Sequence, residues 1–356
     1  MKGKRKTKIF LGGFINSTNA QNLNCLALAK YLDKSKYEIY TMAFENGDFE
    51  VVPIEGVHII KARLPYRIFK YWCWLKGLAM CDISYLPHYC LYDYLFFWKK
   101  LLNKKIFRTV EGVIIGTNYD IHIDLFKNED KLRYKLNKPD KSYAITKYMA
   151  TYNYNNLGIK SDGVLYLGVD FDLFKNNKTT TKLTDIILIG NNLKYKGIED
   201  FYKMAETFSN IYFHIVGGGG NYDVVSETKK QNLPNVILHG SLSHDKLSEV
   251  LKNVQLMFFP SRSEGFPKVT LECASAGVPC IVYGDYGASE WITTGKDGFV
   301  INTLEEAKTI IEDLVANPDK VKELSKNAVE LGRRFNWKNV IKDWEKVIDD
   351  MICNKI

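Results

Sequence analysis

The strongest constraint on the fold is an alternation that begins near Thr184. Short apolar runs are separated by longer amphipathic stretches, the pattern of parallel strands joined by crossover helices. The predicted strands are DIILIG, IYFHIVG, NVILHG, QLMFFP, PCIVYG and GFVIN, and the predicted helices between them are GIEDFYKMAETFSN, YDVVSETKKQNL, HDKLSEVLKNV and PKVTLECASAG. This half of the chain is therefore expected to form a doubly wound α/β sheet.

The first half repeats the theme less regularly. TKIFLGG, YEIYTMAF, CDISYLP, KKIFRTVEG and KSYAIT are expected strands, and AQNLNCLALAKYL is an expected helix. A chain of 356 residues exceeds the usual size of one hydrophobic core. We therefore expect two α/β domains, with turn residues in LYLGVDFDLF marking the boundary. Ligands of such domains bind at the carboxyl ends of the strands, so two facing domains would form a cleft.

Composition limits the class of protein. No apolar run reaches the roughly 20 residues of a spanning helix, and LYDYLFFWKKLL is interrupted by Asp93, Lys99 and Lys100. The start MKGKRKTK is interpreted as a solvated basic tail rather than a signal peptide. Seven cysteines without a C-x-x-C pair suit a reducing cytoplasm. The net charge of +8 would attract phosphate-bearing partners, whether nucleotides, anionic membranes or nucleic acid.

The strongest site signal is FFPSRSEGFPKVTLECASAGVPCIVYG. A buried strand is followed by a polar loop, and Pro267 occupies the expected first position of a helix, with Gly277 as its C-terminal cap. The N–H groups of Lys268 and Val269 would then favour an anion such as a diphosphate.

Two carboxylates accompany this helix start. Glu264 lies in the loop and Glu272 lies on the helix, so both could accept hydrogen bonds from the sugar and ribose hydroxyls of one elongated ligand. The alternative is one solvated glutamate and one ordinary helix glutamate. The strand, loop, proline and glycine around the pair favour the ligand site.

PSRSEGFPKVTLECASAGVP resembles the P-S-x-x-E-G-F-G/P-x-x-x-x-E-A-x-A-x-G-x-P motif of the family 4 retaining glycosyltransferases of GT-B fold, the glycosyl transferases group 1, and departs from it only at Cys273. Other segments that resemble the family are LGG at 11–13, GVDFDLF, the K-G pair at 196–197, GASEWITTGKDGFVI and FNWKNVIKDW. The resemblance implies two Rossmann-like doubly wound domains facing across a cleft. The acceptor-side domain would span 1–168 and be completed by the C-terminal helix 336–356; the donor-binding domain would span 169–335.

The resemblance also implies an activity. The family transfers a sugar with retention from a nucleotide sugar, here expected to be a UDP-sugar, to a glycan or lipid-linked acceptor, as in cell-surface polysaccharide or glycolipid synthesis. No cofactor or metal is expected, and the enzyme would be cytoplasmic or peripheral on the inner face of the membrane. Alternatives are a sugar-nucleotide epimerase or phosphorylase of the same fold, or a non-enzymatic nucleotide or nucleic-acid binding protein. The aromatic residues form no recognisable RNA-binding motif, so no nucleic-acid partner is expected.

Residue roles follow from the matched motifs. By resemblance Lys196 contacts the donor diphosphate, and the backbone at Leu242 contacts the base. Asn191 stands where the family has an arginine, so either Arg262 or another cation compensates, or diphosphate binding is weaker. The expected donor-binding set is Gly12, Gly13, Asn191, Lys196, Leu242, Arg262, Glu264, Gly265, Phe266, Pro267, Lys268, Val269 and Glu272.

The catalytic candidates are Lys196, Glu264 and Glu111. Lys196 would neutralise charge on the departing nucleotide. Glu111, in KKIFRTVEGVIIG, stands where many relatives carry a histidine. It could bind a donor hydroxyl, assist proton transfer or favour positive charge in the transition state, or it could be a structural loop residue. Gly12 and Gly13 are expected to let the backbone approach the donor, because they have no Cβ.

Three further patterns bear on metal or cofactor binding. Asp170 and Asp172 form a D-x-D, and Asp120, His122 and Asp124 would share one face of a strand. We favour a linker turn and a solvated face over metal sites for these two. GGGG at 217–220 lacks the order of a dinucleotide fingerprint, so NAD is not inferred.

Residues 66–98 contain twelve Phe, Trp or Tyr residues, with basic residues on either side. Such composition suits a membrane interface or a lipid-linked acceptor. Burial in the core of the first domain explains the same composition.

Overall fold

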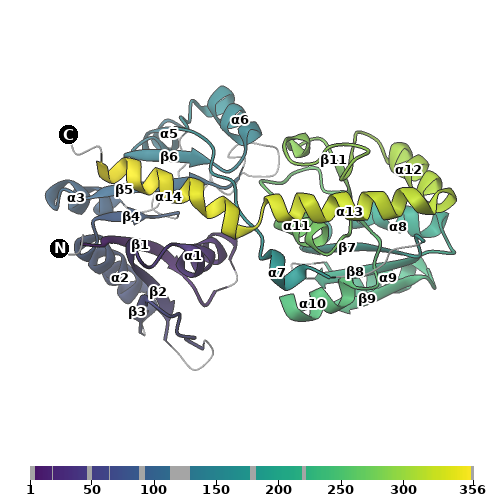
Figure 1. The fold of residues 1–356 in the computed structure, drawn as a ribbon, viewed down its shortest axis with the longest axis horizontal. Coiled ribbons are helices and arrows are strands. Elements are labelled where there is room, and N and C mark those ends of the chain that lie inside the picture. Colours follow the sequence, from purple (N-terminus) through teal and green to yellow (C-terminus); the bar gives the residue numbers. More distant parts are fainter. Residues whose placement is uncertain are drawn as a thin grey trace. The chain divides into compact units, whose positions relative to one another are not determined.

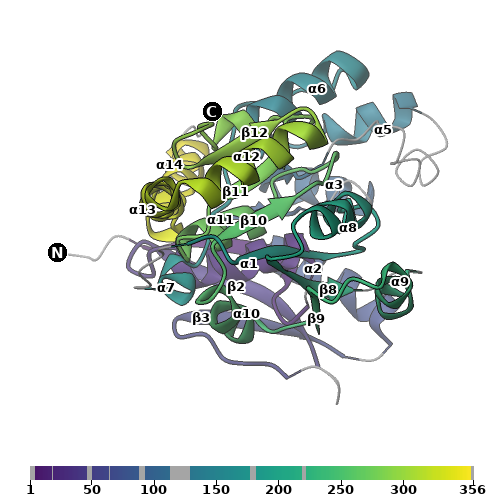
Figure 2. The ribbon, with the colours of Figure 1, turned by 90° about the vertical axis from the view of Figure 1, so that its right-hand side faces the viewer.

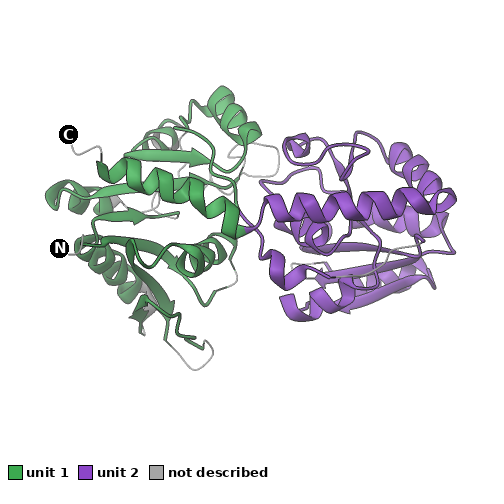
Figure 3. Ribbon diagram, viewed as in Figure 1, with its two compact units in different colours: residues 1–167, 337–356 green, residues 168–336 purple. Residues whose placement is uncertain are grey.

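The structure, a computed structural model, describes residues 5–17, 19–45, 50–63, 65–87, 93–112, 129–176, 182–218 and 222–353. The chain divides into two compact units (Figure 3). Unit 1 consists of Met1–Leu167 and Trp337–Ile356, and unit 2 consists of Gly168–Asn336.

Unit 1 contains a six-stranded parallel sheet with the order β3-β2-β1-β4-β5-β6 (Figure 1). Its strands are β1 (Thr7–Phe14), β2 (Tyr37–Phe44), β3 (Val57–Ala62), β4 (Ile83–Tyr85), β5 (Lys105–Val110) and β6 (Lys141–Ala144). The chain order reverses between β1 and β4, which makes their carboxyl ends the switch point of the sheet. The helices are α1 (Ala20–Tyr31), α2 (Tyr66–Met80), α3 (Asp93–Leu101), α5 (Glu129–Leu136), α6 (Lys147–Leu157) and α14 (Trp337–Cys353).

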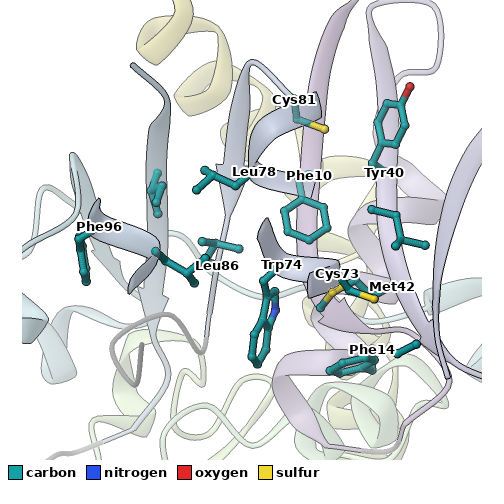
Figure 4. Packing of buried hydrophobic residues seen from close by; sticks show 14 residues of the cluster. Phe10, Phe14, Tyr40, Met42, Cys73, Trp74, Leu78, Cys81, Leu86 and Phe96 are labelled. Atoms are coloured by element: carbon teal, nitrogen blue, oxygen red, sulfur yellow. The ribbon is translucent and has the colours of Figure 1, made fainter. Parts of the chain in front are cut away.

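Helix α2 packs closely on the sheet of unit 1. Cys73, Trp74 and Leu78 point from α2 into a buried cluster that also contains Phe10 of β1 (Figure 4). A Cβ on Gly77 would lie 2.3 Å from the Phe10 ring, so glycine sets how near the helix can approach. The same helix must therefore present its other residues outward.

The C-terminal helix α14 belongs to unit 1 although unit 2 precedes it in sequence. Trp344 is fully buried there; its ring meets that of Tyr85 edge to face with the centroids 5.2 Å apart. Its Nε1 donates to the carbonyl oxygen of Tyr166 at 3.0 Å. These contacts anchor α14 to unit 1.

Unit 2 contains a second six-stranded parallel sheet, with the order β12-β11-β10-β7-β8-β9. Its strands are β7 (Asp185–Asn191), β8 (Tyr212–Gly218), β9 (Val236–Gly240), β10 (Leu256–Phe259), β11 (Cys280–Tyr283) and β12 (Gly298–Ile301). All six coincide with runs expected from the sequence. The order reverses between β7 and β10, so the loops after these two neighbouring strands flank the switch point.

The helices of unit 2 are α7 (Phe171–Phe174), α8 (Ile198–Thr207), α9 (Val224–Gln231), α10 (His244–Leu251), α11 (Lys268–Ser275), α12 (Leu304–Ala316) and α13 (Pro318–Arg334). Figure 2 shows α8 and α9 on one face of the sheet and α10 and α11 on the other. This doubly wound arrangement confirms the predicted fold class. None of the helices in the described ranges is both long and apolar enough to cross a bilayer.

One expected boundary is wrong by a residue. Pro267 was expected at the first helical position, but it is the N-cap of α11, with ψ at 96° outside the helical region. Its carbonyl oxygen accepts hydrogen bonds from the backbone N and the Oγ1 of Thr270, which fixes the helix start. The expected C-terminal cap is confirmed, since Gly277 follows the helix with φ at +72°.

Candidate functional site

The loops after β7 and β10 bring two predicted residues together at the switch point of unit 2. Lys196 lies in the turn between β7 and α8, and Glu264 lies in the loop between β10 and α11. The Lys196 Nζ is 2.5 Å from the Glu264 Oε1, and their side chains are only 24% and 10% exposed. Ser261 Oγ donates to the same carboxylate oxygen at 2.6 Å. The pair therefore forms a partly desolvated polar centre.

Glycines position this lysine. A Cβ on Gly190 would lie 2.9 Å from Lys196 Cγ, so its absence leaves room for the lysine stem to cross the end of β7. Gly197 has a φ of +78°, and a Cβ there would lie 2.2 Å from the Pro260 carbonyl oxygen. The turn can approach the β10 loop only because both positions are glycine.

Glu272 is a buried carboxylate on α11. It is 8% exposed, and burial raises its pKa above the ordinary carboxyl value, while the charges of His244 and Lys268 oppose that rise. Its closest ion-pair partner is His244, whose Nε2 is 3.9 Å from Oε1. Across the described ranges, no group donates a hydrogen bond to this carboxylate. Such a group is poised to accept hydrogen bonds from a ligand.

The sequence did not single out His244. It begins α10, and its ring meets that of Phe174 on α7 edge to face at 5.7 Å. Helices α10 and α11 lie on the same face of the sheet, which is why His244 approaches Glu272 although 28 positions separate them in sequence. A histidine directly after the loop HGSLS was the only available signal.

The start of α11 is the expected anion site. No side chain caps this end, and Lys268 and Val269 are the first two helical residues. The positive end of the helix dipole therefore faces the loop that carries Glu264. Phe266 differs from its neighbours: its ring is buried against Trp291, with centroids 4.9 Å apart, so of this residue only the backbone is available to a ligand.

The remaining donor-side candidates occupy different environments. Asn191 is exposed at the end of β7, and Leu242 is half-buried between β9 and α10. Arg262, the cation that could compensate for Asn191, forms an ion pair with Asp285 at 2.9 Å and stacks on the Tyr283 ring at 3.8 Å. This ion pair must be exchanged before Arg262 can bind a diphosphate.

Comparison with known proteins gives a family match for unit 2. The family model for "Glycosyl transferases group 1" matches residues 170–331, which cover almost all of unit 2 and the whole of this site. Unit 2 of the chain is therefore similar to the group 1 glycosyl transferases.

The relatives extend the match beyond unit 2. An uncharacterized glycosyltransferase from Methanocaldococcus jannaschii is 24% identical over 91% of this chain and 92% of its own length. An alpha-galactosylglucosyldiacylglycerol synthase from Streptococcus pneumoniae is 31% identical, but over only 45% of this chain and 44% of its own length.

Solved structures show the fold. Anabaena HepE in complex with UDP matches with a TM-score of 0.77 at 15% identity, covering 97% of this chain and 100% of that chain; the complex with UDP-glucose matches with a TM-score of 0.75. The chain has the GT-B fold, with two Rossmann-like domains.

Unit 1 contains Glu111, directly after β5. Asn24 Nδ2 donates to its Oε2 at 2.9 Å, and Thr109 Oγ1 donates to its Oε1 at 2.8 Å. Tyr85 Oη also donates to Oε1, at 3.2 Å. Glu111 is therefore held by three side chains from α1, β4 and β5, at the carboxyl edge of the unit 1 sheet.

Gly12 and Gly13 have packing roles in addition to any contact with a donor. They lie where the register between β1 and β2 shifts, between Leu11 and Phe14. A Cβ on Gly12 would lie 2.3 Å from Leu86 Cδ2, and one on Gly13 would lie 2.7 Å from Cys25 Sγ. Close packing inside unit 1 therefore favours glycine at both positions, most strictly at Gly13, where a Cβ would also lie 2.9 Å from Cys25 Cβ.

Two buried polar groups near the donor-side loop were not predicted from the sequence. Tyr286 and Trp291 are 1% and 2% exposed, and within the described part of the chain neither Tyr286 Oη nor Trp291 Nε1 has a hydrogen-bond partner. Burial raises the pKa of Tyr286 well above its ordinary value, and the Glu264 charge adds to the rise. The hydroxyl therefore keeps its proton.

The two metal-like sequence patterns lie in different parts of the chain. Asp170 is the N-cap of the short helix α7, and Asp172 lies in its first turn. Asp120, His122 and Asp124 lie outside the described residues. Among the residues that are described, no group of three or more His, Cys, Asp or Glu side chains could hold a metal ion.

The GGGG run at 217–220 begins at the end of β8. Gly217 has a φ of +114° and allows the close approach of β8 to Gly190, while 219–220 are not described.

Some aromatic residues of the segment 66–98 are buried in the core of unit 1, and others are exposed at its surface. Trp74, Tyr85 and Phe96 are buried in unit 1. Trp72 and Phe97 are 49% and 64% exposed. Core packing therefore explains some of these residues but not all of them.

Proposed function

We propose that the chain is a retaining glycosyltransferase that transfers a sugar from a UDP-sugar to a glycan or lipid-linked acceptor, in polysaccharide or glycolipid synthesis. Unit 2 would bind the donor and unit 1 the acceptor. The observation that carries the proposal is the Lys196–Glu264 pair at the switch point of unit 2, beside the uncapped start of α11. Cation, helix dipole and carboxylate are the groups that a diphosphate joined to a sugar requires.

The geometry assigns a part of the donor to each group. The diphosphate would lie at the start of α11, with the Lys196 ammonium neutralising its charge. Glu272, which is buried and receives no hydrogen bond from the residues that the structure describes, would accept hydrogen bonds from the ribose hydroxyls. Glu264 would accept one from a hydroxyl of the transferred sugar while Lys196 and Ser261 hold its carboxylate in place.

In the proposed reaction the bond between the anomeric carbon and the diphosphate oxygen breaks, and a bond from that carbon to the acceptor oxygen forms on the same face. The acceptor proton passes to the departing diphosphate, so no protein base is required. Lys196 and the α11 dipole stabilise the negative charge as it develops. Glu111, fixed by Asn24, Thr109 and Tyr85, would stabilise positive charge on the sugar or bind one of its hydroxyls.

The names of related proteins support the choice of substrates. One relative is named as a glycolipid synthase, and a second, from Campylobacter jejuni, as a transferase that acts on a diphospho-undecaprenol acceptor. HepE was crystallised with UDP and with UDP-glucose. We accordingly place the enzyme in the cytoplasm, at the inner face of the membrane, with neither a cofactor nor a metal in the reaction.

A nucleotide panel tests this function. Thermal unfolding in the presence of the common nucleoside diphosphates should show a shift for UDP, because a ligand that binds only the folded state stabilises it. Mass spectrometry with the matching sugar donors and with glycan and lipid-linked acceptors should then detect a glycosylated acceptor. An altered donor without any acceptor would indicate an epimerase, and a requirement for inorganic phosphate would indicate a phosphorylase. Failure of every nucleotide to shift unfolding would refute the proposal.

A further inference from the structure

The outward face of α2 is apolar and basic at once. Ile68, Trp72, Lys76 and Met80 follow one another at four-residue spacing and therefore lie along one stripe of the helix. Ile68 is 66% exposed, Trp72 49% and Met80 41%, whereas the opposite face of α2 is buried in the core (Figure 4). The stripe is thus a surface feature of unit 1 and adds little to its core.

Helix α3 extends this surface. It packs against α2 through Tyr71 and Tyr94, whose rings meet edge to face with centroids 5.5 Å apart. Phe97 and Leu101 of α3, again four residues apart, are 64% and 61% exposed. The outward stripe of α2 together with Phe97 and Leu101 is called the α2–α3 patch below.

Cations accompany these apolar side chains. Lys76 Nζ lies 4.8 Å from the centre of the Trp72 ring, and Lys70 Nζ lies 5.0 Å from that of Tyr71. Residues 66–105 include seven lysines or arginines, of which Lys99 is paired with Asp140 at 2.6 Å, and α2 itself contains no carboxylate. The patch is therefore positively charged as well as apolar.

A hollow of about 410 Å³ lies beside the stripe, between α2 and β3. Phe69, Trp72 and Met80 line it from α2, and Ile60 lines it from β3. Lys61 and Arg63 lie at the same hollow and share one carboxylate, Glu45, at 2.7 and 2.8 Å. Two cations facing one anion leave positive charge beside an apolar hollow.

We propose that the α2–α3 patch binds the surface of a bilayer that contains anionic phospholipid. Exposed tryptophan, isoleucine and phenylalanine side chains would enter the boundary between headgroups and acyl chains, and the lysines would meet the lipid phosphates. A protein partner fits less well, because lysine is depleted in protein–protein interfaces. This inference extends beyond the transfer reaction and does not rest on the donor site.

Vesicle flotation tests the proposal on the full chain. Wild type should float with phosphatidylglycerol-containing vesicles at low salt, should float less at high salt because salt screens the lysines, and should not float with neutral phosphatidylcholine vesicles. The variant Ile68→Ser/Trp72→Ser should bind at least about tenfold more weakly, since two large apolar side chains no longer enter the bilayer.

A matched control removes two exposed aromatic residues of unit 1 outside the patch. Tyr134 and Tyr154 are 64% and 58% exposed on α5 and α6, so Tyr134→Ser/Tyr154→Ser should float like wild type. Hydrolysis of the nucleotide sugar in solution should be unchanged in all three proteins, which separates loss of membrane binding from loss of the donor site.

A second measurement does not depend on the stability of the double variant. Brominated lipid should quench tryptophan fluorescence of the wild type, and Trp72→Phe should still float but lose most of that quenching. Equal flotation of wild type and Ile68→Ser/Trp72→Ser, or no flotation of wild type with anionic vesicles at low salt, would overturn the proposal. Dimers that dissociate in the double variant, without vesicle binding, would assign the patch to a second copy of the chain instead.

Discussion

Replacing Glu272 with glutamine tests the ribose site with little change of shape. The wild-type carboxylate is 8% exposed and faces His244 Nε2 at 3.9 Å, and the amide retains an acceptor oxygen while removing the negative charge. The change therefore isolates the charge of this side chain from its packing.

The size of the effect follows from the hydrogen bonds that a ribose would make. A hydrogen bond to a charged acceptor contributes about 1.5–3 kcal/mol, compared with about 0.5–1.5 kcal/mol for a neutral one. The difference, roughly 1–1.5 kcal/mol, predicts that Glu272→Gln binds UDP about tenfold more weakly than wild type. A UDP analogue without the 2′ and 3′ hydroxyls should bind both proteins equally.

The same variant should be more stable than wild type at neutral pH. Burial raises the pKa of Glu272 in the folded state above its ordinary 4.5, so folding favours the protonated acid. The contribution of the protonated form to the free energy of unfolding is complete below pH 4.5. It is lost as the pH rises through the raised pKa of the folded state. Glutamine does not titrate, so the free energy of unfolding of the variant should exceed that of wild type increasingly as the pH rises.

Calorimetric titration with both ligands and urea unfolding across pH measure these effects. If Glu272→Gln loses affinity equally for UDP and for the analogue, Glu272 does not contact the ribose. If the difference in unfolding free energy between wild type and variant is the same at pH 4 and pH 7, ionisation of Glu272 does not destabilise the folded state. The argument from burial then fails.

Three further predictions concern the same unit. Lys196→Met should lower turnover about a hundredfold or more, as loss of a preorganised charge does, whereas Lys194→Met, an exposed lysine in the same turn, should not; steady-state kinetics compares them. Tyr286→Phe removes a buried hydroxyl without a partner, so thermal unfolding should show equal or greater stability, by up to about 1 kcal/mol. Gly197→Ala should destabilise the fold by more than about 1 kcal/mol in urea unfolding, because its φ is +78° and its Cβ would meet the Pro260 carbonyl.

The sheet of unit 2 could be predicted because each of its strands is a short, mostly apolar run that stands apart from its polar neighbours. In β10 and β11 every residue is buried, so no period-2 pattern was needed to recognise them. β3 of unit 1 was not among the expected strands. It is an edge strand in which only Ile60 and Ala62 are buried, so its sequence lacks the continuous apolar run that marked the others.

The candidate site was predictable for the residues that belong to a recognisable sequence motif. Glu264 and Glu272 come from a single segment, and Lys196 comes from a second matched segment. The approach of His244 to Glu272 depends on how α10 crosses the sheet, and the isolation of the Tyr286 hydroxyl depends on packing around it. Neither leaves a local pattern in the sequence. The reason for Gly12 and Gly13 was likewise hidden, because Leu86 and Cys25 come from other segments of unit 1.

The most direct test of the central claim is an NMR time course of nucleotide sugars incubated with the wild-type chain and with glycan and lipid acceptors. The account predicts that the anomeric signal of one donor, expected to be a UDP-sugar, declines while UDP is released in equal amount. A new glycosidic signal with the same anomeric configuration as the donor should grow at the same rate. A product of inverted configuration would contradict the retaining mechanism, and the absence of consumption of any nucleotide sugar, with no UDP bound in calorimetry, would contradict the donor site itself.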